Sequence, residues 1–210
     1  MAPRLILGSA SPRRRELLER LGVVFTVVAA DVDEGQFPDE PASMYHARIT
    51  MAKLGAVCMR VREMAGPDAA PGLEPTLVIV ADTIVVLGDR VLGKPLNDDD
   101  AKRMLAGLAG QEHEVRTRFL LAHASNDAVV HAQTVTTTVW FRELETEEIT
   151  AYVATGEPRD KAGAYGIQGG AASFVRAIEG SYTSVVGLPL AEVAVALRAV
   201  TRGSPTRALT

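Results

Sequence analysis

Cysteine is nearly absent from this chain of 210 residues, in which Cys58 is the only one. A lone thiol cannot form an intramolecular disulfide, so we expect a reducing, cytoplasmic environment. Cys58 lies in a stretch rich in alanine and methionine, where it is expected to serve as a small buried hydrophobic residue. The sequence shows no Ser/His/Asp order and no reactive-cysteine context, and therefore gives no support to covalent catalysis.

Long apolar runs are also missing. None approaches the length of about 20 residues that a membrane-spanning helix needs, so no membrane partner is expected. Near the N-terminus, basic residues flank an apolar run of only three residues, 5–7, which is shorter than the core of a signal peptide.

Neither sign of charge dominates, since 22 Lys and Arg oppose 26 Asp and Glu for a net charge of -4. This balance argues against a long nucleic-acid track but permits a local basic pocket for a small polyanion. The composition, 47% hydrophobic and 23% charged, is that of an ordinary globular protein with one core or two closely packed lobes. The four histidines lack metal-ligand spacing and are expected to be structural: His46, His113, His123 and His131.

An apolar strand runs directly into a helix start over residues 5–15. Ser11 suits the N-cap position, and Pro12 suits the first helical turn, where proline loses no hydrogen bond. The small residues 8–10 allow a ligand to approach the backbone, and amide groups at a helix N-terminus bind anions. The sequence therefore favours a phosphate site that includes Ser9 and Ser11, although the same residues would also suit an ordinary capped surface helix.

Basic residues follow the capping serine. Arginine presents forked donors that match phosphate oxygens, and we expect Arg13 and Arg14 to face the ligand and Arg15 to face solvent. Lys94 lies on a constrained glycine–proline turn, whereas Lys53 lies in a predicted helix and, taken alone, resembles a solvated lysine. Together these cations would offset the charge of a triphosphate and stabilise the transition state for attack at phosphorus.

Asp82 interrupts apolar sequence between the predicted strands 77–81 and 84–87. A carboxylate there costs desolvation free energy unless it is paired, metal-bound or functional; the alternative is a strand-end acid that caps a turn. Glu34 ends an acidic cluster at residues 31–34. Paired with Glu34, Asp82 could hold a hard divalent cation whose other positions go to water and phosphate oxygens.

Gln168 lies among glycines in residues 165–170. Glycine lets the backbone approach a flat ligand, and the Gln168 amide presents both a donor and an acceptor, which suits recognition of a base edge. Glycine-rich turns are also common where no ligand binds, so this signal is weak by itself.

The pattern predicts alternating helices and strands, after a first strand that ends before residue 8. Helices are expected at 12–21, 41–62, 97–108, 146–154 and 189–200, and further strands at 23–30, 77–81, 84–87, 113–123, 129–141 and 173–178. Residues 64–76 are expected to form a surface loop, and residues 202–210 a frayed tail.

Six ordered motifs make nearly the whole chain resemble the Maf family of nucleotide pyrophosphatases. They are Ser-Ala-Ser-Pro-Arg-Arg at 9–14, Asp-Val-Asp-Glu at 31–34, Ala-Asp-Thr at 81–83, Gly-Lys-Pro at 93–95, His-Glu-Val-Arg-Thr at 113–117, and the segment 160–169. The last motif, together with residues 180–182 and 186–190, resembles the branch that acts on dTTP and UTP.

The resemblance implies a single α/β domain of the inosine triphosphate pyrophosphatase type, with a mixed twisted sheet, flanking helices, two lobes around a cleft, and often a homodimer. It implies hydrolysis of a nucleoside triphosphate between the α and β phosphates, which yields the monophosphate and pyrophosphate with Mg²⁺ or Mn²⁺. Asp82 would accept the proton of water, and base preference would be set by Arg13, Thr83 and Gln168. The phosphate and metal site would be completed by Ser9, Arg14, Glu34, Lys53 and Lys94.

Some positions depart from the family pattern. Gly8 stands where the family often has alanine, Ala109 replaces a frequent serine, and the loop at 64–76 is longer than usual. None of these departures falls on a proposed catalytic side chain. The longer loop is expected to affect the contacts between lobes and the geometry of a dimer. Activity on CTP or on modified nucleotides such as 7-methyl-GTP is an alternative substrate choice, and a nucleotide-responsive regulator of cell division is an alternative function.

Overall fold

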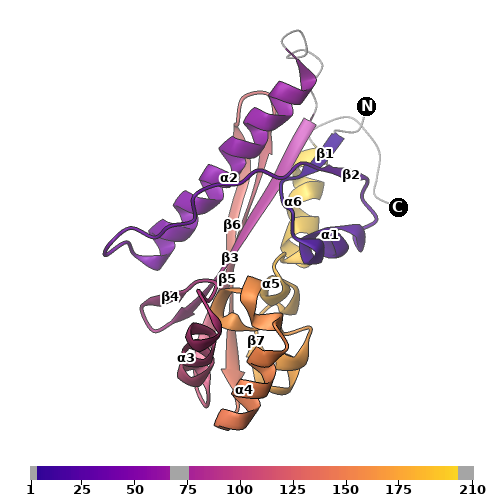
Figure 1. Cartoon of the computed structure of the whole chain (residues 1–210). Coiled ribbons are helices and arrows are strands. Elements are labelled where there is room, and N and C mark those ends of the chain that lie inside the picture. Colours follow the sequence, from indigo (N-terminus) through magenta and orange to yellow (C-terminus); the bar gives the residue numbers. More distant parts are fainter. Residues whose placement is uncertain (1–3, 67–75, 203–210) are drawn as a thin grey trace. The chain divides into compact units, whose positions relative to one another are not determined.

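The computed structural model describes residues 4–66 and 76–202, and Figure 1 shows their arrangement into helices and strands. Most of the expected loop at 64–76 and of the expected tail at 202–210 lies outside these residues. The elements are β1 (Arg4–Leu7), α1 (Pro12–Glu19), β2 (Phe25–Val27), α2 (Ala42–Ala65), β3 (Thr76–Leu87), β4 (Arg90–Leu92), α3 (Asp98–Leu108), β5 (Glu112–His123), β6 (Val129–Phe141), α4 (Thr146–Ala154), β7 (Val175–Glu179), α5 (Tyr182–Val186) and α6 (Leu190–Arg202). Three 3-10 turns follow α4: η2 (Glu157–Asp160), η3 (Ala162–Ala164) and η4 (Gly170–Ser173).

The strands form one mixed seven-stranded sheet in the order β2-β1-β3-β5-β6-β7, with β4 paired to β3. β1 runs parallel to both of its neighbours, so that Leu5 lies opposite Phe25 on β2 and Leu77 on β3. β4 returns antiparallel to the end of β3, and β7 pairs antiparallel with β6. This mixed α/β architecture confirms the expected fold class.

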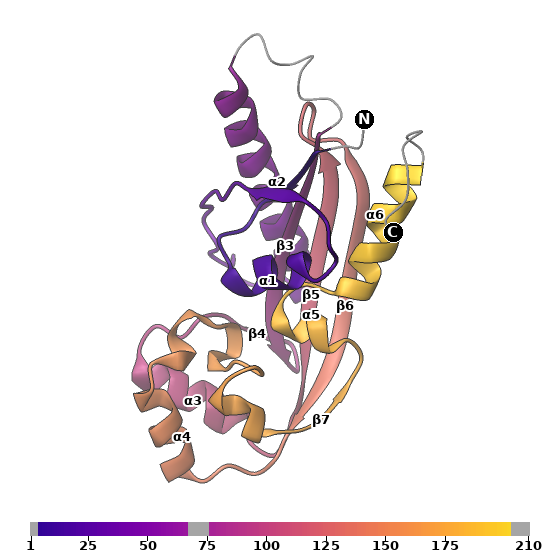
Figure 2. The same ribbon diagram turned by 90° about the vertical axis from the view of Figure 1, so that its right-hand side faces the viewer.

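The chain divides into two compact units, and the strands β3, β5 and β6 contribute to both. The first unit comprises the described residues 4–66, 76–82, 118–134 and 187–202. Its core packs Leu54, Val57 and Cys58 of α2 against Val78 and Val80 of β3, which confirms that Cys58 is buried. Figure 2 shows α2 and α6 on opposite sides of the strands in this unit.

The second unit comprises residues 83–117 and 135–186. Its core joins α3 and α4 to aromatic rings from several segments. Phe141 makes edge contacts with Tyr165 and Phe174, and Tyr152 makes an edge contact with Phe174. These contacts pack the irregular segment 157–174 against regular structure.

Several boundaries differ from the sequence prediction. The predicted break at Asp82 is wrong, because β3 runs unbroken over Thr76–Leu87. A charged side chain does not interrupt backbone pairing when its carboxylate has partners. β2 is shorter than predicted, α2 extends to Ala65, and β7 begins only after η4; the short helix α5 was not predicted. Among the described helices, none is long and apolar enough to cross a membrane.

Candidate active site

Two serines and an arginine meet at the turn between β1 and α1. Ser11 has extended backbone angles and caps α1, its hydroxyl accepting a hydrogen bond from the Arg14 amide at 3.4 Å. The Ser9 hydroxyl accepts from the Ser11 amide at 3.2 Å and from Arg14 Nη1 at 3.4 Å. The Arg14 Nε donates to the Gly187 carbonyl at 2.9 Å, which fixes the guanidinium over the helix start. The structure thus brings together three of the predicted residues.

The backbone at this turn needs Gly8. A Cβ atom at this position would lie 2.7 Å from a methyl of Val80 and 3.0 Å from one of Val57. The absence of a side chain therefore lets the end of β1 pack directly on the core of the first unit.

The three arginines at the start of α1 differ in environment. Burial lowers the pKa of Arg14, and the neighbouring charge of Arg13 lowers it further, whereas Asp82 and Glu34 act in the opposite direction. Arg15 pairs instead with Glu19 at 3.0 Å, and its side chain is 64% exposed, as predicted. Arg14 is therefore a desolvated cation of this turn, whereas Arg15 is an exposed one.

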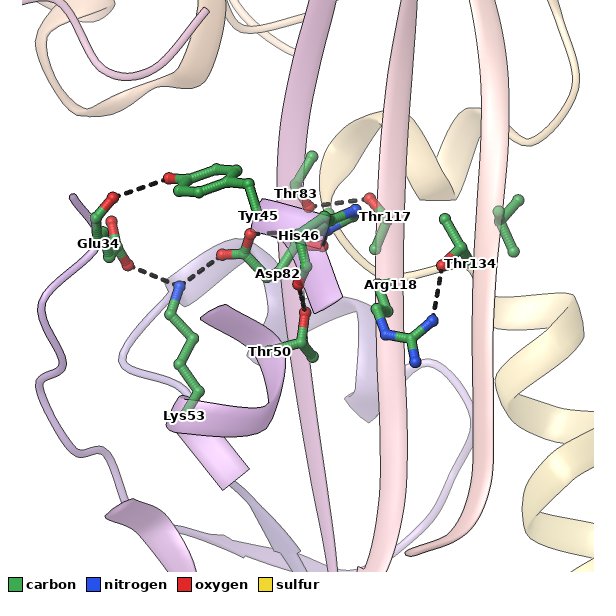
Figure 3. Close-up of polar contacts among 12 residues, drawn as sticks. Glu34, Tyr45, His46, Thr50, Lys53, Asp82, Thr83, Thr117, Arg118 and Thr134 are labelled. Carbon is green, nitrogen blue, oxygen red and sulfur yellow. Dashed lines mark hydrogen bonds and ion pairs between the residues drawn. The ribbon is translucent and has the colours of Figure 1, made fainter. Parts of the chain in front are cut away.

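Two carboxylates and a lysine form the charged centre of the first unit (Figure 3). The Lys53 ammonium lies 2.6 Å from Glu34 Oε1 and 2.5 Å from Asp82 Oδ1. Asp82 is only 7% exposed as a residue, and side-chain exposure is 15% for Lys53 and 40% for Glu34. Three residues far apart in the sequence are thus joined, with the Lys53 ammonium as the link between the two acids.

Tyr45 and His46 contact this centre, and the sequence reasoning missed both. The Tyr45 hydroxyl donates to the Glu34 carbonyl at 2.9 Å. His46 is 2% exposed, and its Nε2 lies 3.0 Å from the Asp82 carbonyl oxygen and 3.6 Å from Asp82 Oδ2. Burial lowers the pKa of His46, which favours the neutral ring, and a carbonyl can only accept, so Nε2 carries the proton. The spacing of His46 and Lys53, seven residues apart on a helix, was the available signal, because that spacing places both on one face.

The remaining predicted residues belong to the second unit. The Thr83 hydroxyl lies 2.9 Å from the Thr117 hydroxyl, which donates to the Ser184 carbonyl at 2.7 Å. Lys94 and Gln168 are both exposed. The Gly163 amide donates to the Gly93 carbonyl at 3.0 Å, which ties the turn that carries Lys94 to the segment that carries Gln168.

Nearly the whole sequence is similar to that of known proteins. Residues 4–200 match the family described as Maf-like protein. The chain belongs to the Maf family. A relative from Anaeromyxobacter dehalogenans (strain 2CP-1 / ATCC BAA-258) named dTTP/UTP pyrophosphatase is 49% identical over 199 residues, which cover 94% of each chain. Proteins of the same name from Hahella chejuensis and Geotalea uraniireducens are 47% and 49% identical, over 93% and 92% of this chain and 91% and 93% of their own. The family predicted from the six motifs is confirmed.

This Maf protein offers two carboxylates as candidate ligands for a divalent cation. In the part of the chain that the structure covers, no three His, Cys, Asp or Glu side chains are grouped in a way that could hold a metal ion. Glu34 and Asp82 nevertheless reach the same ammonium and supply the oxygen donors that Mg²⁺ and Mn²⁺ prefer. Two carboxylates fit a cation that shares its coordination with water and phosphate, rather than a closed structural site.

Proposed function

We propose that this chain hydrolyses dTTP and UTP to the nucleoside monophosphate and pyrophosphate. The observation that carries the proposal is the centre of Asp82, Lys53 and Glu34, in which Asp82 belongs to a buried strand. The capped start of α1 adds arginine side chains in the same unit. The relatives named dTTP/UTP pyrophosphatase support the choice of substrate.

In this proposal Asp82 is the general base. Its Oδ1 is engaged by Lys53, so we assign Oδ2 to the attacking water. The water oxygen bonds to the α phosphorus, its proton passes to Asp82, and the bond from the α phosphorus to the bridging oxygen breaks to release pyrophosphate. The Asp82 backbone is fixed by the His46 ring, which keeps the carboxylate in place during the transfer.

The other residues are assigned by unit. In the first unit, Ser9, Ser11 and the amides that open α1 bind phosphate, and Arg14 and Lys53 stabilise charge that develops in the transition state. In the second unit, Lys94 adds positive charge toward the phosphates. We assign base preference to Arg13, Thr83 and Gln168.

A divalent cation, Mg²⁺ or Mn²⁺, is part of the proposal. Glu34 and Asp82 are the residues that would hold it. When bound, the cation would neutralise phosphate charge.

Product identification tests the proposal. Purified protein is incubated with Mg²⁺ or Mn²⁺ and with dTTP, UTP, CTP or 7-methyl-GTP, and the products are separated by anion-exchange chromatography. We expect dTMP or UMP with equimolar pyrophosphate. Release of orthophosphate with a nucleoside diphosphate, or no turnover of either dTTP or UTP, would refute the proposal, and faster turnover of a modified nucleotide would reassign the substrate.

A further inference from the structure

The segment 166–170, which carries Gln168, is held at both ends by one pair of side chains in the second unit. The Gly166 amide donates to the Tyr152 hydroxyl at 3.1 Å, and the Gly170 amide donates to Glu157 Oε2 at 3.0 Å. Tyr152 and Glu157 are joined to each other, because the Tyr152 hydroxyl donates to Glu157 Oε1 at 2.9 Å. We call Tyr152 and Glu157 the loop clamp.

Side chains lie close to the backbone at the two ends of the turn, Glu157 at Gly169 and Lys161 at Gly166. The Gly169 amide donates to the Gly166 carbonyl at 3.0 Å, which closes a tight turn with Gln168 at its third position. A Cβ atom on Gly169 would overlap the Glu157 carboxylate, and one on Gly166 would lie 2.7 Å from Lys161 Cε. Gly169 thus lies directly against Glu157 of the clamp, and Gly166 lies against the Lys161 side chain.

Both residues of the clamp are held by further contacts in the second unit. Tyr152 is buried near the end of α4, where its ring packs against Phe174. Burial raises the pKa of Tyr152, so the phenol keeps its proton and remains a donor. Glu157 lies at the start of η2, and the Lys161 ammonium donates to the Glu157 carbonyl at 2.6 Å. Just before the turn, the buried Tyr165 hydroxyl lies 2.8 Å from Nε2 of His113.

We propose that Tyr152 and Glu157 are positioning residues that hold Gln168 ready for the nucleotide base. This rests on the proposed function, in which Gln168 contacts that base. An exposed glutamine between glycines would otherwise sample many conformations, and binding would have to order them at a cost in affinity. In a turn that is fixed at both ends, this loss of conformational freedom has already occurred on folding, so binding does not have to supply it.

A carboxylate suits the clamp because both of its partners donate. Glu157 accepts from a hydroxyl and from an amide, one on each oxygen. Glutamine keeps an acceptor oxygen at only one of these two positions and places an NH₂ donor at the other, whereas alanine serves neither. Glu157→Gln is therefore a graded variant of the more severe Glu157→Ala, and Tyr152→Phe removes the other half of the clamp.

The kinetic test uses the full chain with dTTP and Mg²⁺. We expect Glu157→Ala to raise KM by about tenfold with a smaller change in kcat, and Glu157→Gln and Tyr152→Phe to raise it by about threefold. Glu179→Gln, which neutralises an exposed glutamate on β7 in the same unit, is the matched control and should leave KM unchanged.

A double-mutant cycle separates positioning from general stability. If the clamp acts through Gln168, Glu157→Ala adds nothing to KM once Gln168→Ala is present. Equal effects of Glu157→Ala with and without Gln168 would overturn the proposal, and so would an unchanged KM in Glu157→Ala. Should Glu157→Ala fail to fold, the same cycle is run with Glu157→Gln.

Hydrogen exchange provides a readout that does not depend on turnover. The amides of residues 166–170 should exchange faster in Tyr152→Phe and in Glu157→Gln than in the wild type, with Glu179→Gln unchanged. Unaltered exchange in these variants would refute the clamp even if KM rose. If the wild type releases no pyrophosphate, the proposed function fails and the role in base positioning falls with it, whereas an active wild type with insensitive variants refutes the clamp alone.

Discussion

Asp82 is the residue at which the predicted local structure was wrong, and its role as general base stays a proposal. Its isolation in apolar sequence predicted that it is paired, metal-bound or functional, and the structure pairs it with Lys53, which also contacts Glu34. The cation expected between Glu34 and Asp82 stays a prediction. The break in the strand was wrong, because the choice between a strand end and a strand interior depended on partners from α2 that lie far away in the sequence. For His46 the only signal in the sequence was its spacing from Lys53, because its contact with Asp82 also joins distant segments.

Replacement of Asp82 by asparagine should reduce kcat for dTTP by about 10²-fold or more while the protein stays folded. Asparagine preserves the size of the side chain but cannot accept the proton of water. Turnover is measured by pyrophosphate release, and folding by circular dichroism. Asp127→Asn is the matched control, because Asp127 also pairs with a basic residue of α2, Arg62, at 2.6 Å in the first unit. A variant Asp82→Asn with wild-type turnover would remove Asp82 from the role of general base.

His113 should make stability depend on pH. Burial lowers its pKa to about 4, below the ordinary histidine value of about 6.5 in the unfolded chain. The unfolded state therefore binds the proton first, so the contribution of neutral His113 is fully present above pH 6.5 and is lost as the pH falls toward 4. The size of this loss is of the order of 3 kcal/mol.

Urea unfolding from pH 7.5 to 4 measures the effect. Relative to the wild type, His113→Gln should show a weaker decline of the free energy of unfolding over this range, although it is less stable at pH 7.5. His123→Gln, on the same strand β5, serves as the control and should follow the wild type. Parallel decline in His113→Gln and the wild type would contradict the assignment.

Helices whose starts are marked by a capping residue in the sequence were predicted correctly. Ser11 caps α1 as expected, and α3 begins close to the predicted residue 97, where the Asn97 side chain accepts from the Asp100 amide at 2.9 Å. Residues 160–170 are a polar, glycine-rich stretch in the sequence, yet the segment 157–174 contains three 3-10 turns. The segment contacts Tyr152 just before it and the distant residues His113 and Val85, and such contacts leave no periodic pattern in the sequence.

Gly163 connects the turn that carries Lys94 to the segment that carries Gln168, because its amide donates to the Gly93 carbonyl. It has φ of 67°, and a Cβ atom there would lie 3.0 Å from a methyl of Val85. Gly163→Ala should therefore lower the free energy of unfolding by about 1–3 kcal/mol and raise KM for dTTP. Thermal unfolding and steady-state kinetics measure both effects.

The control for this substitution is Gly107→Ala in the last turn of α3. A Cβ atom at Gly107 would meet only Leu87, at an ordinary 3.9 Å, and alanine favours a helix. We expect that variant to be more stable by about 0.5–1 kcal/mol. Equal stability changes in the two variants would show that the left-handed backbone of Gly163 has no structural importance.

At the scale of the whole molecule, the ordered motifs were sufficient to predict the family and the mixed α/β class. The division into two units distributes the predicted residues, with Thr83, Lys94 and Gln168 in the second unit and the others in the first. A net charge of -4 does not conflict with an anionic substrate, since the basic residues gather locally at the start of α1. The expected homodimer stays a prediction.

Metal removal should separate activity from stability. The described residues hold no closed group of three or more His, Cys, Asp or Glu ligands, and the two candidate carboxylates already share the Lys53 ammonium. A chelator should therefore abolish turnover of dTTP while the melting temperature stays within about 2 °C, because no structural metal site has to be vacated. Activity should return on titration with Mg²⁺ or Mn²⁺. Full turnover in the presence of chelator would contradict the cation's role, whereas a large fall in melting temperature would show that metal supports the fold itself.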